Sequence, residues 1–252
     1  MTYILVTNDD GVHAPGILAL AQAMRNLGEI EVTAPATNQS ASGHKKTLFQ
    51  PMPIESTTLA DGTPALAVGG SPADCIALSA LGLSVRWPPR LVVSGINRGA
   101  NLGQDVTYSG TVTAALEATI NGVPAVAISL ENRLADKVED YAAAAQVAVA
   151  VVRRALEKPL PAFTILNVNV PKGEVKGIRL ARQGLRIYHD ELEIQSDGNS
   201  YRIVGPEPTG NVDSPGTDLW AINQGYASIT PIHLDLTAHQ FMAELATWDI
   251  VL

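Results

Sequence analysis

Hydrophobic and polar positions alternate along the first part of the chain in a way that predicts a strand, a helix and a second strand. Residues 3–6 form a short apolar run with β-branched members, which is typical of a buried strand. The polar segment 7–11 interrupts this run. From Pro15 onward, apolar residues recur at the spacing of one helix face, at Ile17, Leu20, Ala21, Met24 and Leu27. Gly28 is a typical helix terminator, and residues 29–34 have the pattern of the next strand.

The same rhythm continues to about residue 168. Strands are predicted over residues 65–68, 90–93, 123–130 and 163–168, and helices over residues 111–121 and 136–156. The segment Ser71-Pro72-Ala73-Asp74 has the capping-box pattern of a further helix start, and Asp136 is the expected cap of the long helix, with Glu139 in its first turn. Alternating units of this length predict an α/β fold in which helices cover both faces of a parallel sheet, a three-layer α/β/α arrangement.

Beyond Gly173 the pattern changes to short strand-like pieces separated by turns. This region is interpreted as a β-rich extension, with a last strand over residues 226–230 and a final helix over residues 237–248. We therefore expect a single domain over residues 1–252, in which residues 1–172 form the core and residues 173–252 the extension.

Composition narrows the class of protein. The chain has 252 residues, is 46% hydrophobic and 17% charged, and carries a net charge of −8, which argues against disorder and against binding of a nucleic-acid polymer. A single cysteine, Cys75, excludes a disulfide framework and a cysteine-cluster metal site. We expect no membrane association, because the chain lacks a bilayer-length apolar run, and a cytoplasmic location, because no basic leader precedes residue 3.

The adjacent carboxylates Asp9 and Asp10 stand directly after the first predicted strand. Neighbouring carboxylates repel each other, so holding them together makes sense if Gly11 lets the backbone turn and a cation lies between them. Oxygen ligands suit Mg²⁺ or Mn²⁺. Taken alone, an Asp-Asp-Gly sequence is more often an acidic turn in which one aspartate caps the next helix.

The segment after the second strand, residues 36–46, is also rich in small polar residues. Ser40 or Ser42 could complete a metal shell, and Lys45 and Lys46 could attract an anion. Taken alone, this segment reads more readily as an ordinary surface loop.

The strongest signal runs from Ser94 to Thr111, after the strand at 90–93. Glycines at 95, 99, 103 and 110 permit close approach of a ligand, and Asn97 and Asn101 offer polar groups. The triplet 109–111 opens a helix, and free amides at a helix N-terminus bind phosphate. Ser109 could alternatively be only a helix cap.

Several other chemistries lack support in the sequence. The chain has no nucleophile-elbow pattern, no dinucleotide fingerprint after the first strand and no Walker A sequence. Its five histidines show no metal-ligand spacing.

Taken together, the segments 6–16, 94–103 and 109–112 resemble the SurE family (survival protein E), with secondary similarity at residues 70–75 and 228–231. The resemblance implies a metal-dependent nucleoside-monophosphate phosphatase with a Rossmann-like core, whose C-terminal segments are exchanged within a homodimer or homotetramer. It implies one Mg²⁺ or Mn²⁺ per subunit, with ligands Asp9, Asp10, Ser40 and Asn97. The implied catalytic residues are Asp9, Asp10 and Asn97. The implied phosphate or substrate contacts are Asn8, Ser42, Gly43, Asn101, Ser109, Gly110 and Thr111.

The hypothesis is therefore hydrolysis of nucleoside 5′-monophosphates by a metal-activated water, with 3′-monophosphates and short polyphosphate as further substrates that the family implies. Two alternatives stay open. One is a non-catalytic sensor of nucleotides or other phosphorylated ligands. The other is a phosphatase that forms a covalent aspartyl intermediate.

Overall fold

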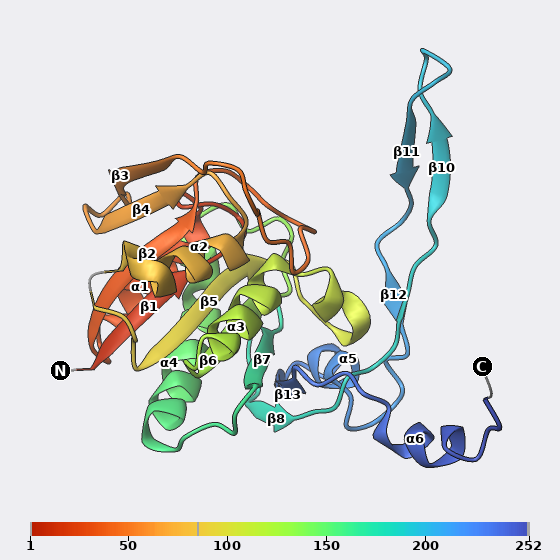
Figure 1. The fold of residues 1–252 in the computed structure, drawn as a ribbon. Helices are drawn as coiled ribbons and strands as arrows, with labels where there is room; N and C mark the ends of the chain where they lie inside the picture. Colours follow the sequence, from red (N-terminus) through yellow and green to blue (C-terminus); the bar gives the residue numbers. More distant parts are fainter. Residues whose placement is uncertain (1, 85, 251–252) are drawn as a thin grey trace.

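A nine-stranded, mostly parallel sheet runs through the protein, whose computed structural model describes residues 2–84 and 86–250 (Figure 1). Six adjacent strands run parallel, in the spatial order β4 (Pro64–Val68), β2 (Glu29–Pro35), β1 (Tyr3–Thr7), β5 (Leu91–Arg98), β6 (Ala125–Leu130) and β7 (Thr164–Val170). β3 (Ile54–Thr58) is antiparallel to β4 at one edge. At the other edge, β13 (Ala227–His233) is antiparallel to β7, and β8 (Ile178–Leu180) is parallel to β13.

Helices cover both faces of this sheet. α1 (Pro15–Met24) and α4 (Ala142–Glu157) contact each other on one face, and α2 (Pro72–Leu78) and α3 (Gly110–Ile120) contact each other on the other face (Figure 1). Each face has its own apolar core, one built around Ile17, Leu20 and Val152 and the other around Val112 and Ile76. The three-layer α/β/α arrangement predicted from the alternating pattern is confirmed.

Local sequence explains the individual elements. All five residues of β1 are buried, as an uninterrupted apolar run predicts for a strand covered on both faces. The predicted capping box is present at α2: Ser71 Oγ accepts a hydrogen bond from Asp74 N at 3.1 Å, and Asp74 Oδ2 accepts one from Ser71 N at 2.9 Å.

β5 is longer than predicted, because it continues through Gly95 to Arg98 rather than ending at Val93. The register with β6 shifts between Ser94 and Asn97, where three residues of β5 span two of β6. A Cβ on Gly95 would lie 2.3 Å from the carbonyl oxygen of Ile128, so only glycine fits this bulge. Gly95, which lies just beyond the predicted strand, therefore carries β5 forward into the polar segment.

The long helix was also predicted incorrectly at its start. The helix α4 begins at Ala142 rather than at Asp136, and it has no side-chain cap. The Asp140 carboxylate instead accepts hydrogen bonds from the backbone N–H groups of Asp136 and Lys137 at 3.0 and 3.1 Å, which caps the turn before α4. A 3₁₀ turn, η3 (Val138–Tyr141), therefore precedes α4. Several further elements were not predicted, among them the edge strand β3, the helical turn η1 (Ser79–Leu83) after α2, the 3₁₀ turn η2 (Gly103–Thr107) and the helix α5 (Asp218–Asn223).

The chain beyond Gly173 partly joins the core and partly leaves it. β13 and β8 complete the sheet, and α5 (Asp218–Asn223) packs against β13 and β7. β9 (Arg186–Ile187) pairs with β12 (Thr209–Gly210) at the base of an arm. The arm ends in the hairpin of β10 (Glu191–Ile194) and β11 (Tyr201–Val204), which projects from the core, as does α6 (His239–Leu245) (Figure 1). Within the described residues, no helix combines the length and apolarity that crossing a bilayer requires.

Candidate active site

The candidate site lies where the order of the strands reverses. From β1 the chain passes through α1 to β2 on one side, whereas β5 lies against β1 on the other side, with Val6 beside Val93 and Thr7 beside Ser94. The connections from β1 and β5 therefore diverge beyond the carboxyl ends of these strands. In doubly wound sheets, this point of divergence is where ligands bind.

Asp9 follows β1 and is almost completely buried, with 3% of its surface exposed. Its Oδ1 accepts a hydrogen bond from the Thr111 hydroxyl in the first turn of α3. Burial, and to a smaller degree the neighbouring charge of Asp10, raises the pKa of Asp9 from 3.8 to about 6, although the bond from Thr111 acts in the opposite direction. The fold thus holds a carboxylate where its negative charge is unfavourable, which indicates a site built for a cation.

Asp10 and Asn97 complete the polar end of the two strands. Asp10 Oδ2 accepts a hydrogen bond from Arg98 N at 2.9 Å, which ties the turn after β1 to the end of β5. Asn97 Nδ2 donates to Gly99 O at 2.7 Å. Among the described residues, no hydrogen bond engages Asn97 Oδ1, so this oxygen is available to a ligand.

One cavity of about 230 Å³ collects five of the predicted site residues: Asp9, Ser40, Asn97, Asn101 and Ser109. Asp10 lines an adjoining cavity, which meets the first at Arg98. The other predicted residues lie behind the first cavity rather than on its wall: Asn8, Ser42, Gly43, Gly110 and Thr111. Asn8 Nδ2 donates to Gly11 O at 2.8 Å and so stabilises the Asp-Asp-Gly turn.

The loop that carries Ser40 is fixed on α3 and α2 rather than free. Glu117 of α3 is buried, and its carboxylate pairs with His44 Nε2 at 3.0 Å and Lys46 Nζ at 3.1 Å. Burial favours the protonated form of Glu117, but these two partners outweigh it and lower its pKa. Asp74 accepts a hydrogen bond from Thr47 N at 2.8 Å. Lys46 is therefore engaged in holding this loop, and the loop is not an ordinary flexible surface segment.

Two residues predicted to contact phosphate, Asn101 and Ser109, are also held by hydrogen bonds. Ser109 Oγ accepts a hydrogen bond from Val112 N at 3.1 Å, so Ser109 is the N-cap of α3. Asn101 is held from behind by two buried asparagines of β7: its N–H donates to Asn169 Oδ1 at 2.7 Å, and its carbonyl accepts from Asn167 Nδ2 at 2.9 Å. These contacts aim Asn101 and the N-terminus of α3 at the same cavity as Asp9.

The donor set fits a hard divalent cation. Asp9, Asp10, Ser40 and Asn97 offer only oxygen as ligand atoms, which is the preference of Mg²⁺ and Mn²⁺. Behind them, Asn8 Oδ1 and Ser42 Oγ are buried without a hydrogen-bond partner among the described residues. Over the same residues, no three His, Cys, Asp or Glu side chains gather into a cluster, so a softer or more highly charged metal centre has no support.

Comparisons with known proteins identify the family of this chain. Residues 4–190 match the family described as Survival protein SurE. The chain belongs to the SurE family. A protein named 5′-nucleotidase SurE from Chloroflexus aggregans is 48% identical over 98% of this chain and 99% of its own length. One of the same name from Syntrophotalea carbinolica is 47% identical over 98% and 97%. The crystal structure of SurE protein from Aquifex aeolicus superposes with a TM-score of 0.82 at 39% identity, covering 96% of this chain and 98% of that one.

Polar residues that line the cavity were missed by sequence reasoning, among them Arg133, Asp105 and Tyr188. Arg133 follows β6, so the rule that ligands gather at carboxyl ends of strands could have identified it. Asp105 and Tyr188 are joined by a hydrogen bond from the Tyr188 hydroxyl, and Arg186 Nε pairs with the same carboxylate at 2.9 Å. Tyr188 comes from the extension, and no local pattern reveals that the base of the arm folds back onto the site.

Proposed function

We propose that this protein hydrolyses the phosphomonoester of nucleoside 5′-monophosphates. The observation that carries the proposal is the convergence of a buried carboxylate, Asp9, and the N-terminus of α3 on one cavity where the strand order reverses. The names of the SurE relatives support the same activity.

The deciding experiment measures inorganic phosphate released from a panel of 5′- and 3′-nucleotides and short polyphosphates, with Mg²⁺ or Mn²⁺ and with EDTA. We expect cation-dependent release, greatest from 5′-monophosphates. Binding of nucleotides without release would favour the alternative of a non-catalytic sensor.

Asp9, Asp10, Ser40 and Asn97 would hold the divalent cation. When bound, such an ion polarises phosphoryl oxygens and lowers the pKa of coordinated water. The chain's own groups account for the rest of the chemistry. The N-terminus of α3, which reaches the cavity wall at Ser109, would orient the phosphoryl group together with Asn101, whose Nδ2 is held by a hydrogen bond to Ser129 Oγ at 2.8 Å. Thr111 keeps Asp9 in place.

Replacing Ser109 by alanine should weaken binding of phosphate without abolishing it, because the helix-terminal amides remain. Loss of one hydrogen bond to a charged group should reduce the free energy of phosphate binding by about 1.5–3 kcal/mol. Loss of the cap should also destabilise the protein by about 1 kcal/mol. Inhibition by inorganic phosphate measures the first effect, and urea unfolding measures the second. Equal inhibition of variant and wild type would leave Ser109 with its capping role alone.

We further propose that water attacks phosphorus directly, so that no phosphoenzyme forms. Asp9 is buried and already accepts a hydrogen bond from Thr111, and Asp10 accepts one from Arg98 N. Two serines, Ser40 and Ser109, line the cavity wall. No histidine lines that wall among the described residues, and Ser109 Oγ is engaged with Val112 N. An activated side-chain nucleophile therefore has no support.

Direct attack should invert the configuration at phosphorus, whereas two successive displacements would restore it. Hydrolysis of a chiral, isotopically labelled thiophosphate monoester, followed by determination of the product configuration, distinguishes the two. Retention would place the covalent aspartyl mechanism first.

We also propose that residues 173–252 form an extension through which subunits associate. In the hairpin, cross-strand pairing places Leu192 opposite Ile203 and Ile194 opposite Tyr201, so one face is entirely apolar, and all four side chains are exposed. An apolar face of this kind on a projecting hairpin is typical of an interface. α6 likewise has no buried residue.

Replacing Leu192 and Ile203 by glutamate should therefore dissociate the assembly while the core stays folded. Sedimentation at micromolar protein concentration should then give a lower molecular mass for the variant than for the wild type. Glu191→Lys, which lies on the opposite face of the same hairpin, is the matched control and should leave the assembly unchanged. If the wild type sediments as a stable monomer, the self-association proposal fails.

A further inference from the structure

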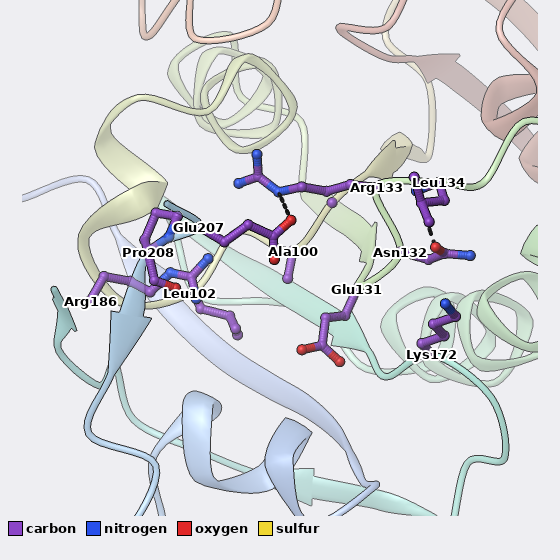
Figure 2. Close-up of a pocket in the computed structure, with 11 residues that line it drawn as sticks. Ala100, Leu102, Glu131, Asn132, Arg133, Leu134, Lys172, Arg186, Glu207 and Pro208 are labelled. Atoms are coloured by element: carbon purple, nitrogen blue, oxygen red, sulfur yellow. Dashed lines mark hydrogen bonds and ion pairs between the residues drawn. The ribbon is translucent and has the colours of Figure 1, made fainter. Parts of the chain in front are cut away.

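A second, larger cavity, of about 480 Å³, opens beside the proposed active site (Figure 2). It lies beyond the carboxyl ends of β5, β6 and β7, and its far wall comes from the base of the arm, at Arg186, Glu207 and Pro208. Gly99, Ala100 and Arg133 line both this cavity and the cavity that contains Asp9. The two spaces are therefore neighbours with a common wall, and a ligand held in the smaller one can extend into the larger.

Glu131 projects into this larger cavity (Figure 2). It is the first residue after β6, and its backbone N–H donates to Val170 O at 2.8 Å, which fixes the start of the side chain. Three cations line the same cavity, and the two arginines among them have other partners: Arg133 Nε lies 3.7 Å from Glu207, and Arg186 Nε lies 2.9 Å from Asp105. The third is Lys172. Among the described residues, Glu131 itself forms no ion pair. Its carboxylate is thus an acceptor that faces the cavity outside any such ion pair, and the charge of Arg186 favours its ionised form.

Resting on the proposed function, we infer that this cavity holds the nucleoside part of the substrate, and that Glu131 accepts hydrogen bonds from the ribose hydroxyls. A ribose presents two adjacent O–H donors, and an ionised carboxylate offers two acceptor oxygens. In doubly wound folds an acidic side chain at the carboxyl ends of the strands commonly binds a ribose in this way. The volume lies within the roughly 300–1,000 Å³ of small-molecule sites.

The cavity on the other side of the active site fits this role less well. It has a volume of about 400 Å³, but it meets the Asp9 cavity only at Arg98. Its carboxylates are Asp10, already assigned to the cation, and Asp136, from the segment before α4. The geometry therefore directs the nucleoside toward Glu131.

The test compares wild type, Glu131→Gln and the matched control Glu139→Gln, an exposed glutamate outside the cavity. Each is assayed with the best-hydrolysed ribonucleoside 5′-monophosphate, its 2′,3′-dideoxy analogue and p-nitrophenyl phosphate, which has no ribose. In Glu131→Gln we expect KM for the ribonucleotide to rise about tenfold, the size expected for a hydrogen bond to a charged group. The rise in KM for p-nitrophenyl phosphate should be at least fivefold smaller than the rise for the ribonucleotide. The wild-type preference for the ribonucleotide over its dideoxy analogue should disappear in this variant, and Glu139→Gln should keep it.

An unchanged preference in Glu131→Gln, or equal losses for the ribonucleotide and p-nitrophenyl phosphate, would overturn the assignment. If the wild type releases no phosphate from any substrate, the proposed function fails, and the subsite is judged by binding alone. Saturation-transfer NMR with adenosine, guanosine, cytidine and uridine then provides the measurement. The assignment requires a signal for at least one ribonucleoside in the wild type that Glu131→Gln loses, and it falls if no ribonucleoside binds or if the variant binds equally.

Discussion

Replacing Asp9 by asparagine should abolish phosphate release from nucleoside monophosphates and, at the same time, stabilise the metal-free protein. Asparagine keeps the carbonyl oxygen that accepts the hydrogen bond from Thr111, so the packing around α3 is preserved. It removes the negative charge that would hold a divalent cation. Even groups that only support a metal ligand contribute about 10- to 100-fold to affinity or activity, so we expect a loss of more than roughly a hundredfold.

The gain in stability has a defined dependence on pH. Burial raises the pKa of Asp9 from 3.8 in the unfolded chain to about 6, so between these values the folded protein binds more protons than the unfolded one. The stability of the metal-free wild type therefore falls as pH rises from about 4 to 6. This difference in pKa corresponds to a change of about 3 kcal/mol in the free energy of unfolding. Asp9→Asn should be more stable by up to this amount above pH 6 and no more stable below pH 4.

Urea unfolding at pH 4 and pH 7.5, with EDTA and with Mn²⁺, measures both effects. Mn²⁺ should raise the stability of the wild type but not that of Asp9→Asn. Asp213→Asn, a change of the same kind at an exposed position, should behave like the wild type. Full activity in Asp9→Asn, or equal stabilisation of both proteins by Mn²⁺, would contradict the assignment of Asp9 as a metal ligand.

The layered fold could be predicted because its signals are local. An apolar run such as residues 3–6, a helix started by Pro15 and the capping box of Ser71 and Asp74 each indicate one element, and their alternation indicates the parallel sheet. The errors arose where tertiary contacts override such signals. Gly95 lies outside the predicted strand 90–93, yet it is part of β5, where the carbonyl of Ile128 leaves space only for a glycine.

The residues of the candidate site show the same difference between local signals and tertiary contacts. Asp9, Asn97 and Ser109 could be found because each stands directly after a predicted strand or before a predicted helix. Tyr188, which reaches the cavity from the arm, and Asn167, which supports Asn101 from β7, carry no such signal. Their roles depend on which strands become neighbours, and pairing between distant segments is not encoded in any short pattern.

Gly110→Ala should inactivate the protein although it changes one hydrogen into a methyl group. Gly110 is the first residue of α3, and an added Cβ would lie 2.8 Å from Asp9 Cβ and 2.9 Å from Ser42 Oγ. Asp9 is almost completely buried and Ser42 Oγ is enclosed, so the added methyl crowds both side chains. The methyl must therefore displace Asp9 or the start of α3, and both belong to the proposed site. A displacement of about 1 Å can reduce activity about a hundredfold.

Stability alone would not account for this loss. Alanine is a better helix former than glycine by about 1 kcal/mol, which offsets part of the overpacking cost of about 1–3 kcal/mol. The matched control is Gly122→Ala, just beyond the other end of α3, where nothing lies within 4 Å of an added Cβ but φ is +76°. That variant should be destabilised by more than about 1 kcal/mol through backbone strain and keep its activity. Parallel measurement of urea unfolding and phosphate release separates the two effects. Equal activities in the two variants would show that the close approach of α3 to Asp9 is not required for catalysis.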